Sequence, residues 1–108
     1  MQNNLFDYRP IDYKRVEGKT TQERFDSFDA LNPHVYQALV RMALKMRRTG
    51  RKHYGMRALL EVLRWQWAIQ TQGEDLKLNN NYTPYYARKL MRNHTELAGF
   101  FKLRQINR

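Results

Sequence analysis

The chain has 108 residues, of which 20 are basic and 10 acidic, so its formal net charge is +10 at pH 7. With 42% hydrophobic residues, this length suits one domain with a single core rather than a fully disordered chain. The sequence has no cysteine, which excludes disulfides, Cys-zinc sites and thiol chemistry, and no apolar run near the ~20 residues of a membrane span. Because the polar start is also unlike a secretory signal, we expect a soluble cytoplasmic protein that binds no membrane and needs no cofactor.

The first 19 residues show no sustained hydrophobic period and are predicted to be an N-terminal arm, followed by a single helical domain over residues 20–108. Thr20 and Glu23 have capping-box spacing, which predicts the start of a short helix. We expect one face of this helix to dock on the core through Phe25, Phe28 and Leu31. Asn32, as N-cap, and Pro33 then predict the start of a second helix.

Two stronger helices are predicted over about residues 33–49 and about residues 56–70. The first has one apolar stripe of helical period, formed by Val35, Ala38, Leu39, Met42 and Met46. The second has two such stripes, formed by Met56, Leu59, Leu60, Leu63 and Trp67 and by Ala58, Val62, Trp65 and Ile69. Because a helix that is apolar on most sides is normally central, we expect both stripes, including both tryptophans, to be buried.

The last third of the chain predicts a helix between two short strands. Residues 75–79 and 100–104 both alternate apolar with polar side chains and could pair with each other. Between them, Thr83 as N-cap and Pro84 open a helix that runs to about His94. The predicted fold is therefore a mainly α domain of three to four helices with a minor two-stranded β element, similar to a winged-helix or helix-turn-helix arrangement.

The positive charge is concentrated in the middle of the chain. Residues 31–60 carry seven basic and no acidic side chains, whereas residues 1–30 carry five basic and six acidic ones. Excess charge confined to one region predicts a polyanionic partner, and nucleic acid first, with DNA favoured over RNA. We predict a non-enzymatic binding protein whose cations converge on one exposed side.

Ten side chains are predicted to contact nucleic acid: Arg41, Lys45, Arg47, Arg48, Arg51, Lys52, Tyr85, Arg88, Lys89 and Arg92. The first six, in the helix and loop of the basic region, are expected to hold phosphates. The last four recur on the outer face of the helix from Thr83, which is expected to enter or flank a groove.

Two alternatives belong to other functional classes. A basic surface could instead bind an acidic host protein and inhibit or redirect it. Asp75 and Lys77 also form a D-x-K pattern on a predicted strand, as in metal-dependent nucleases, whose chemistry would need a second carboxylate from Asp29 or Glu61. The three histidines are far apart in the sequence and lack metal-ligand spacing, so no metal site is predicted.

Several segments together resemble small proteins encoded by tailed phages and prophages. They are FDSF at residues 25–28, NPHVY at 32–36, YG at 54–55, LEVLRW at 60–65, NNNYTPYYAR at 79–88 and GFF at 99–101. The resemblance spans residues 25–104 and implies a bacterial host cytoplasm and a role in phage genome management or counter-defence. It implies no particular activity and assigns no site residues.

Overall fold

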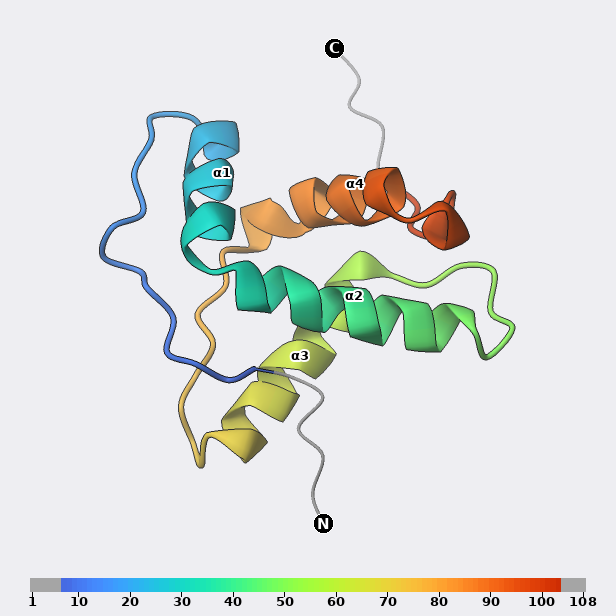
Figure 1. Cartoon of the computed structure of the whole chain (residues 1–108), viewed down its shortest axis with the longest axis horizontal. Helices are drawn as coiled ribbons and strands as arrows, with labels where there is room; N and C mark the ends of the chain where they lie inside the picture. The colour runs from blue at the N-terminus through green and yellow to red at the C-terminus, as the bar shows by residue number, and fades with distance from the viewer. Residues whose placement is uncertain (1–6, 104–108) are drawn as a thin grey trace.

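The computed structural model describes residues 7–103 as a small, mainly helical domain. Its elements are α1 (Thr21–Leu31), α2 (Pro33–Arg47), α3 (Met56–Gln70), the 3-10 turn η1 (Asn80–Tyr82), α4 (Thr83–Asn93) and the 3-10 turn η2 (Thr95–Leu97). In Figure 1, α4 runs above α2, α1 stands at the left end of both, and α3 leads from behind α2 toward the lower left. The molecule is thin, with extents of 42 × 39 × 20 Å.

The predicted capping box at the start of α1 is confirmed. Glu23 N–H donates to Thr20 Oγ1 at 3.1 Å, and Glu23 Oε1 accepts from Lys19 N–H at 2.8 Å and from Thr20 N–H at 3.2 Å. These backbone donors hold the pKa of the Glu23 carboxyl below its usual value. Gly18 has φ +133°, and a Cβ atom there would lie 2.7 Å from the Glu23 Cβ, so this tight approach requires glycine.

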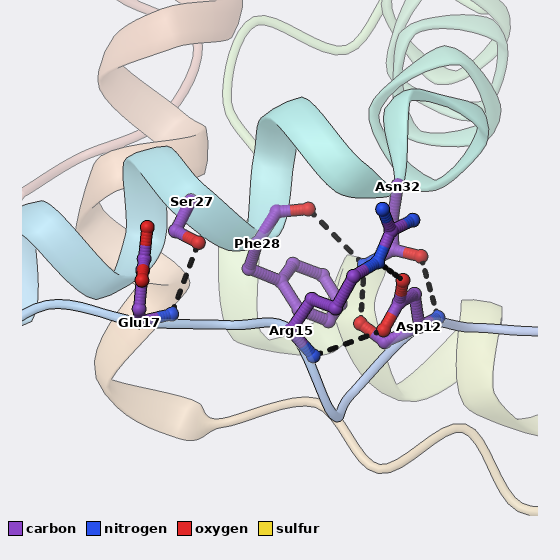
Figure 2. Close-up of polar contacts among 6 residues, drawn as sticks. All are labelled: Asp12, Arg15, Glu17, Ser27, Phe28 and Asn32. Carbon is purple, nitrogen blue, oxygen red and sulfur yellow. Dashed lines mark hydrogen bonds and ion pairs between the residues drawn. The ribbon is translucent and has the colours of Figure 1, made fainter.

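Asn32 has a different role from the predicted one. Its side chain makes no capping bond to α2 but holds the N-terminal arm (Figure 2). Asn32 Oδ1 accepts from Asp12 N–H at 2.8 Å, while Nδ2 donates to the carbonyls of Asp12 and Phe28, both at 3.1 Å. The Asn32 amide binds the arm instead of capping α2 because it satisfies both backbone groups of Asp12 at a buried junction, where Asn32 is 1% exposed.

From residue 7 onward, the arm packs against the helices rather than standing apart from them. The Tyr8 ring meets the Trp67 ring edge-on at 5.1 Å, and the Tyr13 hydroxyl accepts from Lys77 N–H at 2.9 Å. The Glu17 N–H donates to Ser27 Oγ on α1 at 3.1 Å (Figure 2). The arm therefore covers part of the core.

The core is built from one face of each helix and a few loop anchors. The α3 stripe that contains Leu59, Leu60, Leu63 and Trp67 is buried, as predicted. The prediction that the second stripe is buried is wrong, because Val62, Trp65 and Ile69 are 40%, 66% and 56% exposed. Both α2 and α4 pack on α3 from the core side, and among residues 7–103 no further helix covers the opposite face of α3.

The predicted two-stranded element is also wrong, and with it the winged-helix assignment, because no strand occurs between residues 7 and 103. Residues 75–79 belong to a loop in which the Leu78 N–H donates to the Leu76 carbonyl at 3.1 Å, and their alternation anchors that loop: Leu76 and Leu78 are buried and Lys77 is exposed. Phe100 and Phe101 are both buried after a turn in which Gly99 has φ +72°, so two consecutive side chains point into the core. Residue 104, the predicted end of the second strand, lies outside the described residues.

Candidate nucleic-acid interface

The exposed side of α2 carries a shallow basic groove. Five residues line about 380 Å3: Arg41, Leu44, Lys45, Arg48 and Thr49. The three cations lie at positions i, i+4 and i+7, so the helical period brings them to one side of α2, as the sequence predicts. We call this surface the α2 groove.

The acidic side chain of Glu96 approaches one cation of the α2 groove. Arg48 makes a two-pronged ion pair with Glu96 of η2, with Nε–Oε2 at 2.8 Å and Nη2–Oε1 at 2.7 Å. The pair lowers the pKa of the Glu96 carboxyl and raises that of the Arg48 guanidinium. Both side chains are about half exposed to solvent, so the pair ties η2 to the end of α2 and partly neutralises Arg48.

The loop between α2 and α3 is held in place by its own polar contacts. Arg47 Nη1 donates to the Arg51 carbonyl at 3.2 Å, and Arg51 Nε donates to the His53 carbonyl at 3.3 Å, with its guanidinium 5.1 Å from the Tyr54 ring centre. The Tyr54 N–H donates to the Phe100 carbonyl at 3.1 Å. Arg51 and Lys52 remain exposed, so this loop presents cations on a fixed backbone.

The predicted outward row on α4 is divided by the structure. Arg88 and Arg92 are exposed, as predicted. Lys89 instead lies in a part-buried ion pair with Asp29 of α1, and its ammonium is 4.2 Å from the Tyr36 ring centre. Tyr85 stacks on Phe25 at 5.4 Å between ring centres and is only partly exposed. Tyr85 and Lys89 therefore dock α4 onto α1 and α2.

Arg88 lines a second depression, between the N-terminal ends of α3 and α4. This cleft holds about 500 Å3 and is lined by Gly55, Met56, Arg57, Asn80, Thr83, Pro84, Arg88, Lys102 and Leu103. We call it the α3–α4 cleft. Of the predicted cations, Arg41, Lys45 and Arg48 thus line one depression and Arg88 lines another.

Arg57 and Lys102 are the cationic residues of this cleft that were not among the predicted site residues. Arg57 lies in the helix predicted from about residue 56, and Lys102 lies in the predicted strand over residues 100–104, which does not form. One signal was available for Arg57, because it belongs to the acid-free basic region and follows the helix-starting Gly55. Lys102 had no such signal, since only the turn at Gly99 brings it to the start of α3.

Five acidic side chains of the described region form ion pairs, three of them with arginines outside the predicted site. Among residues 7–103 the ion pairs are Asp7–Arg9, Asp12–Arg15, Glu61–Arg64, Arg48–Glu96 and Lys89–Asp29. Only the last two include predicted site residues. The predicted cations in no ion pair with residues of that range are Lys45, Arg47, Arg51, Lys52, Arg88 and Arg92.

The residues of the nuclease alternative are not brought together as that chemistry would require. Asp75 is exposed on the unpaired 75–79 segment, while Asp29 is paired with Lys89 and Glu61 with Arg64 at 2.8 Å. Over the described range, no three His, Asp or Glu side chains gather where they could hold a metal ion. His34 is buried instead, with its Nε2 at 3.0 Å from the Arg9 carbonyl.

Comparisons with protein-family models, with curated proteins and with solved structures find no match to this chain. None of the helices between residues 7 and 103 combines the length and the apolar character that crossing a membrane requires. The two basic depressions and the loop that joins them are therefore the features of this surface from which a function can be inferred.

Proposed function

We propose that this protein binds nucleic acid, duplex DNA in the first place, and that it acts as a binding protein rather than as an enzyme. The observation that carries the proposal is the α2 groove, where three of the five lining residues are cationic. The adjoining loop adds Arg51 and Lys52, and residues 31–60 contain no acid to offset them. A concentrated set of exposed cations is the electrostatic footprint of a phosphate-binding surface.

The geometry favours contacts to phosphates over contacts to bases. Arg51 and Lys52 lie on a loop whose backbone is already fixed, so little conformational entropy is lost when they meet a phosphate. On α4, only Arg88 and Arg92 of the predicted row face solvent, which leaves few side chains for reading base edges. We therefore propose binding with high salt sensitivity and little sequence preference.

The test is the affinity of the full chain for a random duplex, measured by fluorescence anisotropy over a salt series, with single-stranded DNA and structured RNA in parallel. If about six cations each neutralise a phosphate, duplex affinity should fall roughly 10³-fold between 50 and 200 mM salt. The proposal predicts that the duplex binds most tightly of the three. Absence of duplex affinity at the lowest salt would refute it.

A second candidate function, binding to an acidic host protein, is favoured by the exposed stripe on α3. Trp65 is 66% exposed and is flanked by the exposed Val62 and Ile69. Exposed aromatic residues in an apolar patch are common anchors of protein interfaces. If this function operates, Trp65→Gln should abolish binding to one defined acidic host protein and leave duplex affinity unchanged, whereas binding that survives Trp65→Gln would contradict it.

A further inference from the structure

The α3–α4 cleft has the size and charge of a site for a small anion-bearing ligand. Its volume of about 500 Å3 lies within the roughly 300–1,000 Å3 that small-molecule sites occupy. Three of its lining residues, Arg57, Arg88 and Lys102, are cationic. None of the lining residues in the described range is acidic, and all ten acids of the chain lie within that range.

The cations of the cleft are partly held in place. Arg88 has its guanidinium 5.4 Å from the Tyr85 ring centre, and Tyr85 is in turn stacked on Phe25. Arg57 lies in the first turn of α3, whose N-cap is Gly55 and which has no side-chain capping bond. The free N–H groups and the dipole of this helix end add to the attraction for an anion.

The cleft also offers apolar contact. Met56, Pro84 and Leu103 line it, and Met56 is 5% exposed, so the wall includes core side chains. An inorganic anion would make no contact with these apolar side chains. A ligand that carries a phosphate and a flat or apolar part, as a nucleotide does, would contact both kinds of surface.

We propose that the α3–α4 cleft binds a terminal phosphate monoester on a nucleotide, either the phosphorylated end of a nucleic-acid strand or a free mononucleotide. A monoester carries about −1.5 to −2 charge at pH 7, which matches three cations better than the single charge of an internal phosphodiester. A concave site also suits a chain end, whereas internal phosphates lie on a continuous backbone. The strand-end form rests on the proposed function, because it requires the protein to bind nucleic acid.

The test uses the full chain and short single-stranded oligothymidines that carry a 5′-phosphate, a 3′-phosphate or no terminal phosphate. Because charge-assisted hydrogen bonds are strong, we expect a phosphorylated end to tighten binding about tenfold. Arg88→Gln and Arg57→Gln should each abolish most of this preference. The matched control is Arg92→Gln, an exposed arginine one turn further along α4, which should weaken all three strands alike.

Thymidine 5′-monophosphate distinguishes the two sources of the ligand. In an NMR titration it should shift the methyl signals of Met56 and Leu103 in the wild type and not in Arg88→Gln. If the monophosphate displaces the phosphorylated strand at similar concentration, the free nucleotide is a sufficient ligand; if it displaces the strand only weakly, the strand end is the ligand. Both results support the cleft as the site.

The inference is overturned if all three strands bind equally and the monophosphate shifts neither methyl signal, or if the preference survives both Arg88→Gln and Arg57→Gln. Failure of the proposed function looks different. In that case duplex and single strands fail to bind at low salt, while the NMR titration still reports on the cleft.

Discussion

Two regions of the molecule use their charges in opposite ways. In the arm and α1, acidic side chains stabilise the fold: Asp12 pairs with Arg15, Glu23 caps α1, and Asp29 pairs with Lys89 of α4. Residues 31–60, which include the α2 groove, the loop after it and the start of α3, carry seven basic side chains and no acid. The comparison teaches that the excess positive charge lies where the sequence supplies no neighbouring acid, and that Lys45, Arg47, Arg51 and Lys52 there form no ion pair with residues 7–103.

The largest expected effect is on stability, from Asn32→Ala. The substitution removes three hydrogen bonds at a buried junction and leaves both backbone groups of Asp12 without that partner. We expect a loss of roughly 2–4 kcal/mol in the free energy of unfolding, measured by urea denaturation. Ser27→Ala, which removes one exposed bond to Glu17 N–H, is the control and should cost about 0.5–1 kcal/mol. Equal losses in the two variants would refute the structural role given to Asn32.

The second-largest expected effect concerns Lys89, a predicted site cation that pairs with Asp29 of α1. Lys89→Met leaves the Asp29 carboxylate part-buried without its ion-pair partner. We expect about 1–3 kcal/mol of destabilisation by urea denaturation. Duplex affinity at a temperature where the variant is folded should change less than in Arg92→Gln. A large and selective loss of duplex affinity in Lys89→Met would instead return Lys89 to the binding surface.

The helices could be predicted from the sequence, whereas the exposure of the second stripe on α3 and the loop over residues 75–79 could not. The capping residues around Thr20 and the stripe through Leu63 and Trp67 are local signals, and the structure confirms them. The second stripe on α3 is exposed although the sequence predicts that it is buried. Periodicity shows which faces of a helix are apolar, but it does not show whether neighbouring elements cover them. Leu76 and Leu78 alternate with polar residues like a strand because a loop that is anchored in the core by every second side chain has the same period.

The composition of the site could be predicted, but its grouping could not. Each cation of the α2 groove follows from a single helical period, so the sequence was sufficient there. The α3–α4 cleft gathers Arg57, Arg88 and Lys102 from three separate segments, and no local pattern specifies such an arrangement. Lys89 could not be separated from Arg88 by spacing alone, because its burial depends on how α1 docks.

A smaller effect should be seen in the pH dependence of stability. Burial lowers the pKa of His34, and its Nδ1 is buried with no partner among the described residues. Because the folded-state pKa lies below the unfolded value, the unfolded state binds the proton more readily. Stability should therefore be complete above the unfolded pKa of 6.5 and decrease as the pH falls toward the lower folded value.

Urea denaturation at about pH 7.5 and about pH 5.5 checks this effect. The wild type should be less stable at the lower pH, and His34→Gln should show a smaller difference, since glutamine can still donate to the Arg9 carbonyl and does not titrate. An identical difference in the two proteins would show that other groups cause the pH dependence.

The smallest expected effect is on duplex affinity, when the acidic side chain beside the α2 groove is removed. Glu96 is the acid paired with a cation of the α2 groove, and Glu96→Gln would release Arg48. We expect duplex affinity at low salt to rise about two- to threefold, as for other rim charges, with stability nearly unchanged. The matched control is Glu74→Gln, which removes an exposed acid elsewhere and should change affinity less. A decrease in affinity in Glu96→Gln would contradict the role of Arg48 as a phosphate contact.

The most direct test compares two triple variants that remove the same charge from different places. One is Lys45→Gln with Arg51→Gln and Lys52→Gln, in the basic region, and the other is Lys14→Gln with Lys19→Gln and Lys77→Gln, on exposed sites outside it. The measurement is the slope of log duplex affinity against log salt. We predict that the first variant reduces the magnitude of this negative slope by about 2–3, while the second leaves the slope close to the wild-type value. Equal slopes in the two variants would contradict the claim that the basic region binds nucleic acid.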